Sequence, residues 1–339
     1  MRIILTLALL TALAAAAQAP PEPIGIPRIG LIEFYGLRQV TPQLVRQALS
    51  LSEGSVLPAS KGDAEDRLAD IKQVMAARME AICCENGAII LYVGIEERGQ
   101  PRYEVRPAPG GAEELPPAVR TAYQSYQAAI HAAELHGPVD EDLTQGQPLS
   151  RNPAIRAVQA TLPALVAEHL QELRDVLRDS GDEYQRAVAA DLLPYALAKA
   201  EIVDSLREAL TDNDPLVRSN AVHGLTALAL LERSDAGSRV RVSPTWFIDM
   251  LQSVTWTDRT KAAWALEILT QDRDIFTLSR LRGPAIPSLL EMAAWKTKAH
   301  ARPAFFLLGR AAGLEESAIE SAWTSGNRQI VLAAAATLK

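Results

Sequence analysis

The sequence has 339 residues and a formal net charge of −7, with Lys and Arg scattered singly among Asp and Glu. A chain of this length accommodates two compact domains, or one small domain followed by an extended array of repeats. A surface that binds nucleic acid needs clustered Lys and Arg to displace counterions from phosphates, so the charge pattern argues against that class of partner.

The N-terminal segment has the pattern of a secretory signal peptide. Arg2 provides a positive start, and residues 3–17 form an apolar run that ends in small residues. Cleavage after Ala17 and cleavage after Ala19 both fit, although a proline directly after the cleaved bond disfavours the second. The competing interpretation is a membrane anchor, but the run falls short of the ~20 residues that a spanning helix needs. We therefore predict a signal peptide within residues 1–19, export to the periplasm or the extracellular space, and no transmembrane segment in the mature chain.

Residues 20–27 are rich in proline and predict a linker. Residues 28–98 then predict a small α+β domain. Thr41 and Pro42 supply an N-cap and a first-turn proline for its first helix. Its elements are expected in the order β-α-α-β-β, over residues 29–35, 41–49, 60–71, 74–84 and 88–97.

This domain resembles the POTRA family over about residues 27–98. The resemblance rests on the order of elements, on residues 32–38 (IEFYGLR), on Gly54 and on residues 93–97 (VGIEE). POTRA domains commonly lie in the periplasm of Gram-negative bacteria, bind an extended peptide at a sheet edge, and precede an outer-membrane β-barrel. The resemblance thus implies strand pairing with a partner and a peripheral association with outer-membrane proteins. Because the rest of this chain predicts helices, we expect no direct role in membrane insertion.

The only two cysteines, Cys83 and Cys84, are adjacent on a predicted strand. Exported thiols normally pair, but neighbouring side chains on a strand point to opposite faces. Three alternatives remain open: two free thiols of which one is buried, a disulfide between the neighbours, and an intermolecular disulfide or metal capture. A redox role of Cys83 and Cys84 is a further rival function.

Residues 99–117, rich in Pro and Gly, predict a second linker, and residues 118–165 predict a helical connector. Over residues 166–339 one short motif recurs. Asp214 precedes Arg218, Ala221 and Leu225 on a predicted helix, and this pattern resembles HEAT repeats. The resemblance implies a right-handed solenoid of about five helical hairpins that bury a shared core. Their first helices are expected over residues 170–177, 202–210, 246–254, 285–294 and 314–322.

The repeated acidic and basic positions have a structural interpretation. An aspartate in the turn caps the second helix of a hairpin, and a basic residue four positions later bonds to the neighbouring repeat. The residues assigned to these positions are Asp182, Arg186, Asp214, Arg218 and Lys261. The longer loop between two repeats, residues 234–244, is an expected contact surface.

Histidine spacing argues against metal chemistry. His131 and His136 are five residues apart on a predicted helix, whereas two ligands on one helix face are four apart. HEAT arrays include the iron-dependent deoxyhypusine hydroxylase. A resemblance of this chain to that enzyme would imply His-Glu pairs as iron ligands. The phycobilin lyases share a similar repeat. This sequence has no His-Glu dipeptide. We therefore predict no catalytic residue, no metal and no cofactor, with a hydroxylase-like or lyase-like enzyme as the disfavoured alternative.

Two tryptophans in the later repeats, Trp256 and Trp295, are candidate contacts with a partner, provided that they are exposed. The sequence as a whole predicts a non-catalytic, extracytoplasmic scaffold that binds a protein through its solenoid surface and its sheet edge. The alternative within the same class is an accessory factor in outer-membrane or envelope protein assembly.

Overall fold

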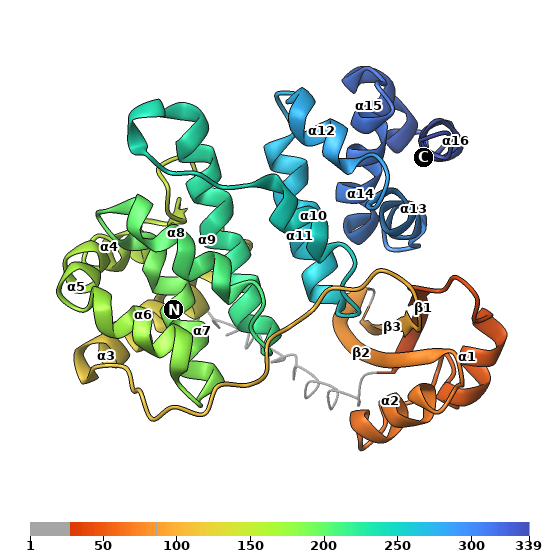
Figure 1. Ribbon diagram of the computed structural model, residues 1–339, viewed down its shortest axis with the longest axis horizontal. Coiled ribbons are helices and arrows are strands. Elements are labelled where there is room, and N and C mark those ends of the chain that lie inside the picture. Colours follow the sequence, from red (N-terminus) through yellow and green to blue (C-terminus); the bar gives the residue numbers. More distant parts are fainter. Residues whose placement is uncertain (1–27, 86, 339) are drawn as a thin grey trace, which may run out of the picture.

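The computed structural model describes residues 28–85 and 87–338. A small sheet region is followed by an extended connection and then by helical repeats, which make up most of the chain (Figure 1). The predicted signal peptide, both of its cleavage positions and the linker over residues 20–27 lie outside the described residues.

The sheet region holds three strands and two helices. In chain order they are β1 (Ile29–Tyr35), α1 (Pro42–Leu49), α2 (Lys61–Ala69), β2 (Val74–Glu85) and β3 (Ala88–Glu97). The strands are arranged in the order β1-β3-β2, with β1 parallel and β2 antiparallel to the central β3. The two edges of the sheet are therefore β1 and β2.

Both faces of this sheet are covered. The helices α1 and α2 start at Thr41 and Ser60, whose hydroxyls accept from backbone N–H groups of the first turn. They bury one face in a small core that includes Val45, Leu68 and Val93. The other face carries Tyr35, Ile90 and Tyr92, which belong to the core of the helical repeats. The sheet is thus a layer between its own helices and the repeat array.

The connector between the sheet and the repeats is mostly helical, as expected from its sequence. It contains α3 (Pro117–Glu134), α4 (Pro153–Gln159) and α5 (Leu162–Glu168). It also contains a short antiparallel pair, β4 (Glu141–Asp142) and β5 (Leu149–Ser150), which the helical prediction did not include.

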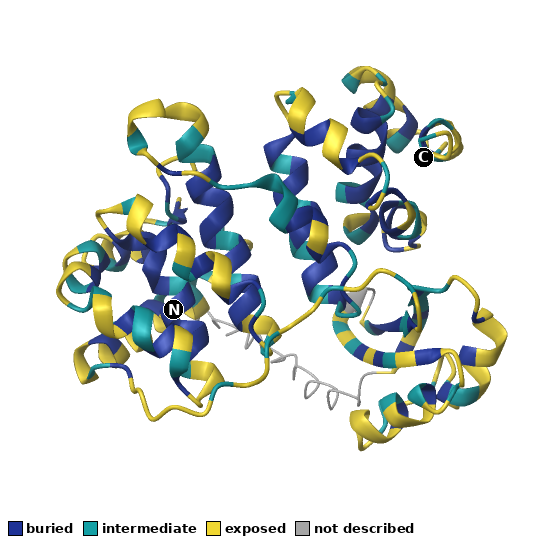
Figure 2. Cartoon of the chain, in the orientation of Figure 1, coloured by how far each residue is buried: buried dark blue, intermediate teal, exposed yellow. Residues whose placement is uncertain are grey.

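The remaining helices form a solenoid-like stack. They are α6 (Leu170–Asp179), α7 (Glu183–Leu192), α8 (Lys199–Ala209), α9 (Pro215–Ser234), α10 (Pro244–Met250), α11 (Trp256–Leu269), α12 (Ile275–Leu281), α13 (Ile286–Ala294), α14 (Lys298–Ala311), α15 (Glu316–Thr324) and α16 (Gln329–Ala335). The helices α7, α9, α11, α14 and α16 contact one another in that order and form an inner row. Figure 2 shows α9, α11 and α14 largely buried, as expected where neighbouring repeats share one core.

One helix of the stack, α12, was not predicted. It begins after Asp274, whose side chain accepts from the N–H of Thr277 at 2.7 Å. Among the described residues, no helix is both long and apolar enough to cross a membrane.

Candidate functional site: the two edges of the repeat stack

Two aspartates of the repeat motif cap inner helices. Asp182 accepts from the N–H of Gln185 at 3.1 Å at the start of α7. Asp214 accepts from the N–H groups of Leu216 and Val217, at 2.9 and 3.0 Å, at the start of α9. Caps of this kind satisfy otherwise unpaired N–H groups and contribute about 1 kcal/mol each.

The arginines of the motif join neighbouring repeats. Arg186 donates to Asp212 through Nε at 3.0 Å and Nη2 at 2.9 Å, and both side chains are almost fully buried. Arg218 donates through Nε to Asp258 at 2.8 Å in an equally buried pair. The motif therefore contains two kinds of acid: Asp182 caps a helix, whereas Asp212 and Asp258 bind an arginine of the preceding repeat.

The assignment of Lys261 to this series is wrong. Helix α11 begins at Trp256 after the N-cap Thr255, so the position four residues past the cap is Arg259. Arg259 donates from Nε to the carbonyl of Ser253 at 2.6 Å. Arg186 and Arg218 each donate from Nη1 to the carbonyl two residues before their own caps, so all three arginines hold the equivalent backbone position. Thr257 lies four residues before Lys261, so this pair imitates the spacing of the motif and displaced the assignment by two residues.

Lys261 instead lies on a polar inner surface of the stack. Its Nζ is 5.8 Å from the ring centre of Trp264, and burial lowers its pKa. The preceding inner helices contact the connector on this surface. His223 on α9 pairs with Glu141 on β4 at 2.9 Å, and Asp191 on α7 accepts from the hydroxyl of Tyr123 on α3 at 3.0 Å. These contacts fix the connector, through α3 and β4, against α7 and α9.

Trp256 and Trp295 are not exposed, so the prediction that they anchor a separate partner is wrong. Their exposed fractions are 9% and 2%. The ring of Tyr92 on β3 lies 4.9 Å from each indole, and Tyr35 on β1 meets Trp295 edge-on at 5.9 Å. The indoles pack on the sheet of their own chain, which removes their large apolar area from water.

Two glutamates on the same sheet face reach the turns before two inner helices. Glu80 on β2 accepts from the N–H of Trp256 at 2.5 Å, and Glu33 on β1 accepts from the N–H of Lys296 at 2.8 Å. Both glutamates are cross-strand neighbours of Tyr92, so the three side chains form one row across the sheet. A carboxylate at a helix N-terminus also interacts favourably with the helix dipole, so the sheet supplies the cap that Thr255 does not.

The sheet also contacts the backbone of the turn before α11 directly. Tyr35 donates through its hydroxyl to the carbonyl of Val254 at 2.7 Å. Gly94 on β3 lies so near that a Cβ atom there would stand 2.1 Å from the same carbonyl oxygen. Only a residue without a side chain fits at this position.

The predicted linker over residues 99–117 is bound to the repeats along its central part, residues 102–115, which we name the strap. Arg106 donates from its backbone N–H to the carbonyl of Thr211 at 2.6 Å. Gly111 donates to the carbonyl of Asp179 at 2.8 Å. The strap therefore runs along the turns that precede α9 and α7 (Figure 1).

The strap also enters the arginine–aspartate series. The Nη2 of Arg106 donates to Asp212 at 2.6 Å, so that this carboxylate is shared with Arg186. Burial by itself raises the pKa of Asp212, but the hydrogen bonds from the two arginines hold the pKa below its ordinary value. The strap and the sheet thus cover one side of the stack, the ladder edge, which consists of the turns before α7, α9, α11 and α14.

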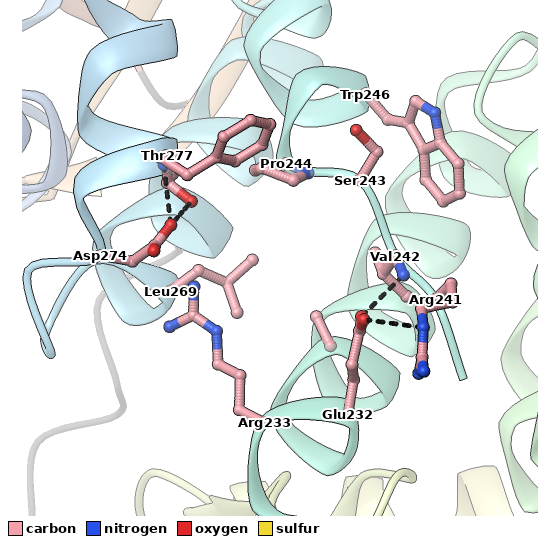
Figure 3. Close-up of a pocket in the computed structure, with 12 residues that line it drawn as sticks. Glu232, Arg233, Arg241, Val242, Ser243, Pro244, Trp246, Leu269, Asp274 and Thr277 are labelled. Carbon is pink, nitrogen blue, oxygen red and sulfur yellow. Dashed lines mark hydrogen bonds and ion pairs between the residues drawn. The ribbon is translucent and has the colours of Figure 1, made fainter. Parts of the chain in front are cut away.

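The opposite edge of the stack contains a pocket of about 530 Å³. It lies between the C-terminal end of α9, the loop that follows, and the beginnings of α10 and α12 (Figure 3). Apolar and charged side chains line it: Ala229, Glu232, Arg233, Arg241, Val242, Ser243, Pro244, Trp246, Leu269, Asp274, Phe276 and Thr277. The loop over residues 234–244, expected to be a contact surface, contributes Arg241 to Pro244 to this lining.

The rim of this pocket exposes apolar side chains. Ile275 and Phe276, at the start of α12, are 83% and 54% exposed. Glu232 accepts from the N–H of Val242 at 2.8 Å and so holds the loop against α9 (Figure 3). Exposed apolar side chains bordered by charged residues mark a candidate protein-binding surface.

The cysteines and histidines occupy separate places. Cys83 is disulfide-bonded, so it is not a free thiol, whereas the side chain of Cys84 lies outside what the structure describes. His131 and His136 are exposed on and just after α3, and His300 on α14 is bonded to the hydroxyl of Tyr92 at 2.7 Å. Within the described part of the chain, no group of three His, Cys, Asp or Glu side chains is placed to hold a metal ion.

Comparison with known proteins identifies the repeats. Residues 170–267, from α6 to α11, match the family model of HEAT repeats. No curated protein and no solved structure matches the chain significantly. The HEAT interpretation of the repeat motif is therefore confirmed for this segment, and the chain contains a HEAT-repeat region.

Proposed function

We propose that this protein is a non-catalytic, extracytoplasmic scaffold that binds a protein partner at the pocket edge of its repeats. HEAT repeats are commonly protein-interaction scaffolds, which supports a role of this kind. The N-terminal signal pattern supports export. The ladder edge is occupied by the chain's own sheet and strap, which leaves the opposite edge for a partner.

The observation that carries this proposal is the exposure of Ile275 and Phe276 beside the pocket. Neighbouring large apolar side chains on a surface lower the solubility of a protein unless a partner covers them. The pocket beneath them contains Trp246, and aromatic side chains in a pocket contribute strongly to binding energy.

We expect the double substitution Ile275→Ser and Phe276→Ser to lower partner recovery at least about tenfold, since the two side chains together represent more than 1.4 kcal/mol of apolar burial. The measurement is quantitative mass spectrometry after crosslinking in the native cell and capture of a C-terminally tagged chain. Substitution of an exposed side chain is expected to change stability by only about 0.5 kcal/mol, so the variant remains folded.

The matched control is Leu197→Ser, because Leu197 is 73% exposed but lies outside the pocket. Equal recovery by the wild type, the double variant and the control would contradict binding at this edge. An outer-membrane protein among the specifically lost partners would favour the envelope-assembly role over a general scaffold.

A second docking site follows from the sheet. The POTRA-like interpretation of residues 28–98 predicts that an extended segment of a partner pairs with an edge strand. Of the two edge strands, β2 is the longer, and it is paired on one side, with β3. We therefore assign strand pairing to the outer edge of β2, consistent with an accessory role toward outer-membrane proteins.

A further inference from the structure

The outer edge of β2 is not simply open. In an antiparallel pair, successive residues direct their N–H and C=O groups alternately toward and away from the neighbouring strand. The N–H of Met79 donates to Oε1 of Glu65 at 2.7 Å, and Glu65 belongs to α2 rather than to β3. The N–H of Met79 therefore faces outward, and by alternation so do those of Ala77 and Ala81, since the register of β2 is regular between Ala76 and Ile82.

The carboxylate of Glu65 is held in this place. Its side chain is only 13% exposed, and it lies 3.5 Å from Nζ of Lys61 and 3.6 Å from Nη1 of Arg78. One of these cations is one turn earlier on α2, and the other is the β2 residue next to Met79. Together they position the carboxylate over the middle of the strand edge.

We infer that Glu65 is a gate on the β2 edge, and that an extended polypeptide segment pairs along the centre of β2 only after displacing it. This inference rests on the strand-pairing part of the proposed function. A pairing segment needs the N–H of Met79 as a donor, and each N–H can serve one strong acceptor at a time. When the backbone carbonyl of the segment takes that place, Glu65 keeps its contacts with Lys61 and Arg78.

The contact of Glu65 with the strand edge also explains how the long edge strand β2 avoids pairing with other chains. An uncovered strand edge is a template for pairing with other chains, and natural proteins protect such edges with charged side chains. Glu65 does so at the N–H of Met79, and Arg78 donates from Nη1 to the carbonyl of Ala77 at 2.8 Å on the same edge. A pairing segment must therefore compete for both groups.

The test compares Glu65→Ala with Asp66→Ala in the full chain. Both variants remove one carboxylate from α2, but Asp66 is exposed, and it is Glu65 rather than Asp66 that accepts from the N–H of Met79. The first measurement is hydrogen exchange of the Met79 amide by NMR. Because the amide loses its acceptor, we expect exchange at least about tenfold faster in Glu65→Ala and unchanged in Asp66→Ala. Glu65→Gln retains an oxygen acceptor and is expected to restore most of the protection.

The second measurement uses a synthetic peptide with the sequence of residues 88–97, the strand that pairs with β2 inside the fold, extended by lysines for solubility. We expect its dissociation constant to be about tenfold lower for Glu65→Ala than for the wild type and Asp66→Ala. The same peptide with alternate backbone amides methylated cannot form the ladder and serves as the negative control.

The outcomes separate the gate from the docking site. Faster exchange together with tighter binding supports both. Unchanged exchange, or equal peptide affinity in all variants, overturns the gate while leaving strand pairing in place. Faster exchange without binding to any variant overturns strand pairing at β2 and, with it, the gate.

Discussion

Substitution of Asp212 by alanine is expected to lower the free energy of unfolding of the repeats by about 3–5 kcal/mol, which is the usual cost of breaking a buried ion pair from one side. The carboxylate is completely buried and accepts from both Arg186 and Arg106. Without it, the guanidinium of Arg186 stays buried next to α7 with only backbone and amide acceptors. The midpoint of urea unfolding, followed by circular dichroism of the helices, measures the loss.

A matched control is Asp204→Ala on α8. Asp204 also pairs with an arginine, Arg207, but its side chain is 82% exposed. Surface pairs of this kind contribute less than about 1 kcal/mol, so the control should unfold close to the wild type. Similar midpoints for the two variants would show that the arginine–aspartate series does not stabilise the stack.

Substitution of Gly94 by alanine is expected to separate the sheet from the repeats without unfolding either part. The backbone angle φ of Gly94 is not positive, so alanine is compatible with β3 itself. Its Cβ would collide with the carbonyl oxygen of Val254 and with the ring of Tyr35, at 2.1 and 2.6 Å. Because one of these contacts is with backbone, the docked surfaces must move apart.

Tryptophan fluorescence reports the separation, since Trp256 and Trp295 pass from a buried to a wet environment and their emission shifts to the red. The radius of gyration from small-angle X-ray scattering should increase in the same variant. Gly62→Ala on α2 is the control, because the only atom near its added Cβ is the Ser60 hydroxyl at 3.9 Å. If Gly94→Ala keeps the emission and the radius of the wild type, the docked arrangement described above is wrong.

Local features of this protein follow from short stretches of sequence. The caps Thr41, Asp182 and Asp214 were identified because an N-cap bonds to N–H groups two or three residues away. Arg186 and Arg218 were assigned correctly as bridging positions for the same reason, since they follow a visible cap at a constant distance. The N-cap of α11, Thr255, has no acidic side chain, so the start of this helix was not recognised from the sequence. Lys261 was therefore assigned to the basic position of the motif instead of Arg259.

The partners of these residues were not predictable in the same way. Asp212 and Asp214 are both aspartates of the same turn. Only the packing of α7 against α9 decides which of the two accepts a hydrogen bond from Arg186. A signal for the docked sheet did exist: Glu33 and Glu80 occur on the strand face that also carries Tyr35 and Tyr92, where a charged side chain requires a polar partner. The sequence could not show that this partner is the start of a helix.

The sequence by itself therefore determined the HEAT motif, the helix caps and the alternation of the strands, because each depends on residues a few positions apart. Only the tertiary structure decided that Trp256 and Trp295 are buried by the chain's own sheet, that the strap binds the ladder edge, and that a pocket lies at the opposite edge. Those contacts join residues such as Glu80 and Trp256, which are 176 positions apart. Their formation depends on how whole elements pack, and packing is a property of the assembled surfaces rather than of any local pattern.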